Sequence, residues 1–185
     1  MRGKAASVSN PKTEAQLDQR ARFGAALRFL QPLTPFLRIG FKNYAVKMTA
    51  FNSAMSYNLN NALAGSYPEY FIDYPSALVS RGSLPGALNP LVECSTPGQV
   101  DFFWEDNSQD ANASTNDKVL LVVFNPAKQL AITIIGGNDR SGGSQVIEVR
   151  STFTGDEVQC YIAFRNANQS VLSNSVYAGL VVVYD

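Results

Sequence analysis

Residues 157–166 read EVQCYIAFRN, and this stretch decides the fold class because apolar side chains recur at every second position. Successive side chains of a strand point to opposite faces of a sheet, so the pattern predicts a strand with one face in a core. The predicted core face carries Val158, Cys160, Ile162 and Phe164. The opposite face carries Gln159, Tyr161, Ala163 and Arg165.

The sequence around this stretch repeats the strand pattern. Val100, Phe102 and Trp104 alternate in the same way, and Trp104 is the predicted centre of the core. Strands are predicted at 100–105, 118–125, 129–135, 144–151, 157–166 and 173–184, with extended segments at 71–74 and 77–80. Residues 83–98 contain Pro85, Pro90, Pro97, Gly86 and Gly98, and are predicted to be an irregular connection or an edge. Short strands separated by turn-rich gaps indicate an antiparallel sandwich.

The N-terminal part has helical spacing instead. Thr13 is a predicted N-cap with Gln16 as its capping-box partner, and Pro32 and Pro35 end the helix that follows. Its predicted apolar face consists of Leu17, Ala21, Phe23, Ala26, Leu27 and Leu30. Further helices are predicted at 35–46 and 49–63, with Gly65 as a stop. The chain therefore divides into an extended arm (1–12), a basic helical region (13–65) and a β-sandwich (66–185).

The charge is divided between the two halves of this organisation. Residues 1–50 hold nine basic and two acidic residues, whereas residues 51–185 hold six basic and thirteen acidic ones, so the net charges are +7 and −7. The nine basic residues are Arg2, Lys4, Lys12, Arg20, Arg22, Arg28, Arg38, Lys42 and Lys47. Opposite charges at two ends of a molecule favour contact between copies or with an anionic partner. The predicted third helix has no charged residue, so we expect it to be a buried spacer.

The composition argues against several kinds of chemistry. The chain has no histidine, which removes the usual general base, the usual zinc ligand and the Ser-His-Asp triad. The adjacent carboxylates at 105–106 and 156–157 point to opposite faces of a strand and do not converge as a glycosidase requires. We therefore predict no catalytic residue, no cofactor and no metal site. Cys94 and Cys160 are expected to be buried thiols, with a disulfide as the alternative.

Two loops contain residue types that occur in ligand sites. Residues 106–117 are rich in Asp and Asn, which are calcium ligands, but the EF-hand glycine and final Glu are missing, so a solvated polar loop is favoured. Residues 136–143 are glycine-rich but precede a strand, so a flexible hairpin tip is favoured over a phosphate site. Nucleic-acid binding is not favoured, because the basic residues are spread rather than clustered. No run approaches the roughly 20 apolar residues of a membrane span, and no apolar stretch follows Arg2 and Lys4 as in a signal peptide.

Two resemblances extend this interpretation. Residues 100–104, 157–167 and 173–177 resemble strands of a fibronectin type III or immunoglobulin-like sandwich. The whole chain is similar to an uncharacterised family of Bacteroidota proteins that also occurs in phage-like contexts. That similarity rests on residues 10–23, 40–52, 78–82 and 173–177. The family implies no activity, and its members commonly carry a Gly- and Val-rich stretch before the position of Met1. The expected fold class is α+β, with two or three N-terminal helices followed by an antiparallel immunoglobulin- or fibronectin type III-like sandwich.

The predicted function is that of a non-enzymatic structural subunit that assembles with copies of itself. The nine basic residues are the candidate contacts to an acidic sandwich face of a neighbouring copy, in a filament, tube, or virion or surface component. Low charge with many Asn and Ser residues favours an extracellular, cell-surface or virion location. The alternative is an extracellular module that binds a glycan or surface protein through its loops. Tyr67, Tyr70 and Tyr74 are candidates for its rim, although a core-capping role is favoured for Tyr70 and Tyr74.

Overall fold

The computed structural model describes residues 12–184, which begin with a long helix, α1 (Glu14–Leu30). The N–H of Thr13 donates to Oε1 of Gln16 (3.3 Å), so the predicted helix start is confirmed. The buried side of α1 carries Ala25, Ala26, Phe29 and Leu30. Phe23 was predicted to lie on this side but is 44% exposed, because it lines an open pocket between α1 and α3.

Shorter helices continue from α1. They are η1 (Gln31–Leu33), α2 (Thr34–Gly40), η2 (Lys42–Tyr44) and α3 (Ala50–Asn61). The second helix ends at Gly40 instead of Val46, because the carbonyl of Gly40 accepts the N–H of Arg81 (2.9 Å) from the sandwich side. The third helix starts at the predicted place, with the Thr49 hydroxyl accepting the N–H of Asn52 (3.1 Å).

The expectation that the third helix is a buried spacer is wrong. Ala54, Met55 and Asn58 are buried, but the opposite side of α3 exposes Asn52, Ser56, Asn60 and Asn61. A helix needs no charge to face water when amides and hydroxyls cover its outer side. The predicted stop, Gly65, lies beyond the helix in a two-stranded hairpin, β1 (Leu63–Ser66) and β2 (Glu69–Ile72).

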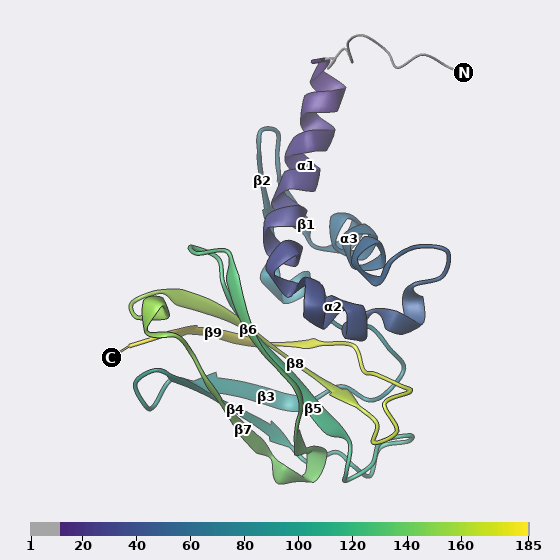
Figure 1. Ribbon diagram of the computed structural model, residues 1–185, viewed down its shortest axis with the longest axis vertical. Coiled ribbons are helices and arrows are strands. Elements are labelled where there is room, and N and C mark those ends of the chain that lie inside the picture. Colours follow the sequence, from purple (N-terminus) through teal and green to yellow (C-terminus); the bar gives the residue numbers. More distant parts are fainter. Residues whose placement is uncertain (1–11, 185) are drawn as a thin grey trace, which may run out of the picture.

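Two antiparallel sheets form the rest of the chain (Figure 1). The three-stranded sheet has the order β3-β4-β7, with β3 (Leu88–Glu93), β4 (Gln99–Glu105) and β7 (Ser144–Glu148). The four-stranded sheet has the order β6-β5-β8-β9, with β5 (Lys118–Asn125), β6 (Leu130–Asp139), β8 (Glu157–Arg165) and β9 (Val176–Val182). Single turns of 3₁₀ helix occur at Tyr74–Ser76, Arg140–Gly142 and Ser151–Phe153. The α+β class with an immunoglobulin- or fibronectin type III-like sandwich is confirmed.

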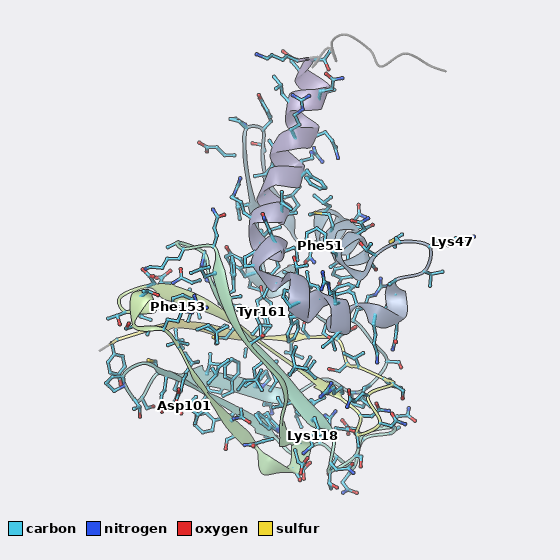
Figure 2. The ribbon with its side chains drawn as sticks, viewed as in Figure 1. Lys47, Phe51, Asp101, Lys118, Phe153 and Tyr161 are labelled. Atoms are coloured by element: carbon cyan, nitrogen blue, oxygen red, sulfur yellow. The ribbon has the colours of Figure 1, made fainter. Side chains whose placement is uncertain are left out.

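The molecule has three layers, because the helices cover the outer face of the four-stranded sheet. One core lies between the sheets and contains the predicted face of β8, namely Val158, Cys160, Ile162 and Phe164, together with Trp104. A second core lies between β5, β8 and the helices and contains Leu120, Val122, Phe124, Tyr161 and Ala163 with Phe29, Leu33 and Phe36. Figure 2 shows Tyr161 beneath the helices, where its hydroxyl donates to the carbonyl of Tyr74 (2.9 Å). The β8 face predicted to be the outer one is therefore buried as well, except at Arg165.

Two loop predictions need correction. The segment 83–98 is not wholly irregular, because it contains β3, which has a bulge between Leu88 and Leu91. Residues 136–143 are not a hairpin tip, because β6 pairs with β5 whereas β7 pairs with β4. The segment crosses from one sheet to the other, and Arg140 within it is completely buried.

Candidate functional site

The basic residues expected to make assembly contacts lie on the surface of the helical layer. Lys12, Arg20, Arg22, Arg28, Arg38, Lys42 and Lys47 are all exposed. Arg2 and Lys4 lie outside the described residues. These seven residues are distributed along α1, α2 and the segments before and after these helices, so they do not form one strip. We call the exposed surface of residues 12–50 the basic layer.

Arg22 is held by a small network on the outer half of α1. Its Nε donates to Oδ2 of Asp18 (2.8 Å), its guanidinium lies 5.0 Å from the ring centroid of Tyr70, and the Tyr70 hydroxyl donates to Asp18. The hydrogen bond from Tyr70, followed by Arg22, lowers the pKa of Asp18 below its ordinary value. The bond to Asp18 raises the pKa of Tyr70. This network ties α1 to strand β2.

The other basic side chains differ in how far they are engaged. Lys42 donates to the carbonyl of Gln169 in the loop after β8, and this contact anchors the helical layer to the sandwich. Arg28, Arg38 and Lys47 form no ion pair within residues 12–184. Large apolar side chains are exposed on the same layer: Phe23, Tyr44, Val46 and Met48. The basic layer therefore combines available cations with apolar surface.

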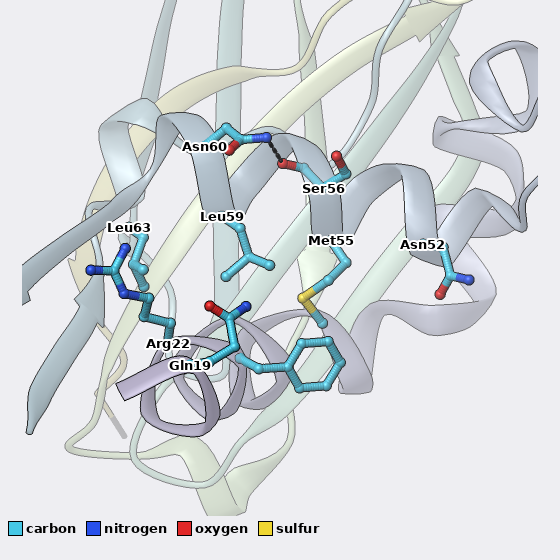
Figure 3. Close-up of a pocket in the computed structure, with 9 residues that line it drawn as sticks. Gln19, Arg22, Asn52, Met55, Ser56, Leu59, Asn60 and Leu63 are labelled. Atoms are coloured by element: carbon cyan, nitrogen blue, oxygen red, sulfur yellow. Dashed lines mark hydrogen bonds between the residues drawn. The ribbon is translucent and has the colours of Figure 1, made fainter. Parts of the chain in front are cut away.

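A groove of about 520 Å³ runs between α1 and α3 (Figure 3). Phe23, Met55, Leu59 and Leu63 supply its apolar lining. Polar side chains complete it: Gln19, Arg22, Asn52, Ser56 and Asn60. The amides and the hydroxyl, beside a guanidinium that is already paired with Asp18, suit a neutral occupant that accepts and donates hydrogen bonds.

The other candidate surface is the outer face of the three-stranded sheet. Apolar side chains occupy its centre, with Leu91 53%, Phe103 40% and Val146 44% exposed. Leu91 lies opposite Phe103, and Asp101 opposite Val146, so these side chains are neighbours on one face. The three strands carry the acids Glu93, Asp101, Glu105 and Glu148 and no basic residue. We call this surface the acidic sheet face.

Sequence reasoning missed the acidic sheet face because it did not place a strand in 88–93. The alternation of 99–105 holds the signal, since Asp101, Phe103 and Glu105 form the side opposite the predicted core. A phenylalanine between two acids on the outer side of a strand is typical neither of a buried core nor of a solvent-exposed face.

The basic residues of the sandwich are largely engaged within the chain. Arg140 is the most buried of them: its Nε donates to Oδ2 of Asp117 (3.1 Å) and its guanidinium lies 3.9 Å from the ring centroid of Phe164. It also donates to Oδ1 of Asn107 (2.6 Å), and its backbone carbonyl accepts Nε1–H of Trp104 (2.6 Å). Burial lowers the pKa of this guanidinium, and the Asp117 carboxylate opposes that effect. Asn107 and Asp117 are buried, so the loop 106–117 is not the fully solvated loop that was predicted.

The pair Lys118–Asp139 (2.6 Å) and the pair Lys128–Asp156 engage two further lysines. Arg81 lies 4.3 Å from the ring centroid of Tyr44 and 5.3 Å from that of Tyr57. The four acids of the acidic sheet face are in no ion pair with any part of residues 12–184. Their charge is available to a partner.

The three tyrosines proposed as the rim of a ligand-binding site do not form such a rim. Tyr74 packs against Phe29 and Phe124 with ring centroids 5.7 and 6.0 Å away, which agrees with the favoured core-capping role. Tyr70 is engaged by Asp18 and Arg22, and only Tyr67 is half exposed. Cys160 is buried as expected, Cys94 is half-buried, and both are free thiols.

Within the described range, Cys, Asp and Glu side chains do not group in threes as a metal site would require. The helices between residues 12 and 184 also lack the length and hydropathy needed to cross a bilayer.

Comparisons with known proteins bear on the whole chain. The model of a family of unknown function, DUF6266, matches residues 1–179. No curated protein sequence matches the chain. Among solved structures, the chain is similar to the solution structure of the fn3 domain of the human collagen α1(XX) chain. That likeness covers 57% of this chain and 91% of that one, at 12% identity and a TM-score of 0.39.

Proposed function

This chain belongs to the DUF6266 family of unknown function, and we propose that it is a non-enzymatic structural subunit that assembles head to tail with copies of itself. In this proposal the basic layer of one copy covers the acidic sheet face of the next. The single observation that carries it is the acidic sheet face, where exposed Leu91, Phe103 and Val146 lie among four acids that form no ion pair within residues 12–184.

The positions of the two surfaces support this assignment. The helices lie on one side of the sandwich and β3, β4 and β7 form the layer farthest from them (Figure 1). Contact between two unlike surfaces on opposite sides of a molecule is heterologous, and it generates rings or open filaments. Both surfaces pair charge with exposed apolar side chains, which gives the contact an apolar centre as well as a charged surround. A virion or cell-surface setting, where repeated subunits are common, is part of the same proposal.

The test is sedimentation velocity over a range of protein concentrations, at low salt and at high salt, with negative-stain microscopy of the same samples. We expect concentration-dependent assemblies at low salt that shrink at high salt, because salt screens charges on exposed surfaces. A protein that stays monomeric at high concentration under both conditions would overturn the proposal.

Charge reversal separates this contact from nonspecific association. Glu148→Lys places a cation on the acidic sheet face and should reduce assembly, whereas Glu157→Lys makes the same charge change away from that face and should not. A sharper version uses two variants that each fail to assemble alone. Glu93→Lys/Glu148→Lys reverses the sheet face, and Arg38→Glu/Lys47→Glu reverses the basic layer. Their mixture should assemble, because each reversed surface then meets a complementary one.

A binding module is the second candidate, and the groove between α1 and α3 favours it. Its amides, hydroxyl and exposed Phe23 ring provide the hydrogen bonds and apolar surface that a neutral glycan would need. The site would then lie on the helices rather than on the sandwich loops. A glycan array is the direct measurement. Signal lost in Asn60→Ala/Phe23→Ala but kept in Tyr67→Ala would establish this function, and an array without signal would exclude it.

A further inference from the structure

The sandwich has four edge strands, and three of them are protected from pairing with another chain. β3 contains Pro90 and a bulge. β7 is short and ends in Glu148. β9 packs alongside β3 of the other sheet and is kinked at Gly179 (φ 129°). Prolines, bulges, charges and short length are the features that keep edge strands from associating.

The fourth edge, β6, has none of these protections over residues 130–135, and its register with β5 shifts only beyond Ile135, next to Gly136 (φ 79°). It is the longest strand, with ten residues, and Leu130–Gly137 contains neither a charged residue nor a proline. Within residues 12–184, no side chain forms a hydrogen bond to the backbone of residues 131–135. The backbone of β6 is first bonded by a side chain at Asn138, whose N–H donates to Oε1 of Gln145 (2.9 Å). A long apolar edge with open backbone groups is a template for another strand.

We propose that the open edge of β6 pairs, antiparallel, with β6 of a second copy. The sequence of residues 131–135, AITII, reads nearly the same in both directions, which suits a two-fold axis through its centre at Thr133. In that register Thr133 lies opposite its own copy, and Ala131 lies opposite Ile135 of the other strand. Lys128 and Asp139, near the two ends of the paired segment, are already engaged by Asp156 and Lys118 of their own chain, so they place no unpaired charge beside the pairing.

The consequence is a joint between two four-stranded sheets. It does not depend on the proposed head-to-tail contact, because β6 belongs to neither the basic layer nor the acidic sheet face. If both contacts form, β6 pairing would link head-to-tail stacks side by side. The two differ in their response to salt, since main-chain hydrogen bonds and apolar contacts persist at about 1 M salt, where the Debye length is about 3 Å.

The test measures dimer formation at high salt, where head-to-tail contact is screened. Thr133 is exposed, so Thr133→Lys should leave folding intact, and it should weaken dimerisation by at least about tenfold by placing a charge in the joint. Val182→Lys on β9 is the matched control, because Val182 is likewise exposed on an edge strand. Equal dimerisation of the two variants would overturn the proposal.

A crosslink gives an independent readout in the folded protein. In a Cys94→Ser background, Thr133→Cys should form a disulfide-linked dimer on mild oxidation, since directly opposed residues of paired strands have Cβ atoms about 5 Å apart. Val182→Cys in the same background should remain monomeric. Crosslinking of Thr133→Cys no faster than Val182→Cys at high salt would refute β6 pairing, whatever the outcome of the head-to-tail test.

Discussion

The two outer faces of the sandwich contrast sharply. The outer face of the four-stranded sheet places Leu120, Val122 and Tyr161 in a core under the helices, where all three are completely buried. The outer face of the three-stranded sheet leaves Leu91 and Phe103 open to solvent among acids. Both faces are apolar at the centre, so what distinguishes them is the cover. The helices cover one sheet within the chain, and in the proposed assembly the helices of a neighbour cover the other.

Removing a large ring from each face tests this contrast and has the largest expected effect. Phe29 lies between α1 and the sheet, with its ring centroid 5.1 Å from that of Phe124. Phe29→Ala should lower the free energy of unfolding by about 3–5 kcal/mol, because it opens a cavity in a closed core. Phe103→Ala on the open face should change it by no more than about 0.5 kcal/mol. Urea unfolding of the two variants provides the comparison, and similar losses would contradict it.

The outer face of the four-stranded sheet, which the helices cover, shows which features the sequence predicted correctly and which it did not. Alternation along β8 correctly placed Val158, Cys160, Ile162 and Phe164 in a core, because period two is a local property of the chain. It could not reveal that Tyr161 is also buried, since that depends on helices at least 100 positions away in the chain. The unbroken apolar run at 119–124 was an available signal, because strands buried on both faces lack alternation.

The acidic sheet face was harder to predict, for a different reason. Asn89 (φ 45°) and Pro90 interrupt the pattern of β3, so that strand looked like a loop. The prediction of a flexible tip at Arg140 rested on the glycines around it and on the predicted strands at either side. The counter-charge of Arg140, Asp117, lies 23 positions earlier, and only the folded chain brings the two together. The candidate contacts of the basic layer followed from composition alone, whereas the surface proposed to receive them needed the sheet topology.

The second prediction concerns the attachment of the three-stranded sheet, which carries the acidic sheet face, to the rest of the sandwich. Asp117→Asn should lower the free energy of unfolding by about 3 kcal/mol, because it leaves the buried guanidinium of Arg140 without its counter-charge. Trp104 of β4 donates to the carbonyl of Arg140, so hydrogen exchange should accelerate in β4 and β7. Exchange in α1 and α2 should change little. Equal acceleration in the helices would mean that the two faces do not differ in attachment.

The smallest effect is expected at the outer half of α1, which extends beyond the sheet beside the β1–β2 hairpin (Figure 1) and is joined to that hairpin by the hydrogen bond from Tyr70 to Asp18. The pKa of Asp18 is lowered in the folded protein, so its carboxylate stabilises this attachment above the ordinary pKa of 3.8. That stabilisation should disappear as the pH falls through the lowered value. Carboxyl chemical shifts of Asp18 between pH 2 and 6 measure the titration, and Asp18→Asn should abolish the pH dependence of helix protection. A midpoint at or above 3.8 would argue against the attachment.

The chain has one tryptophan, and its position has a practical consequence for following unfolding. Trp104 lies between the two sheets, 5.7 Å from the ring of Phe164, and belongs to the core that excludes the helices. Its fluorescence therefore monitors the sandwich alone, while circular dichroism at the helical band monitors α1, α2 and α3. Whether these two optical signals change together or in sequence reports directly on whether the cover and the sheets beneath it melt as one cooperative unit.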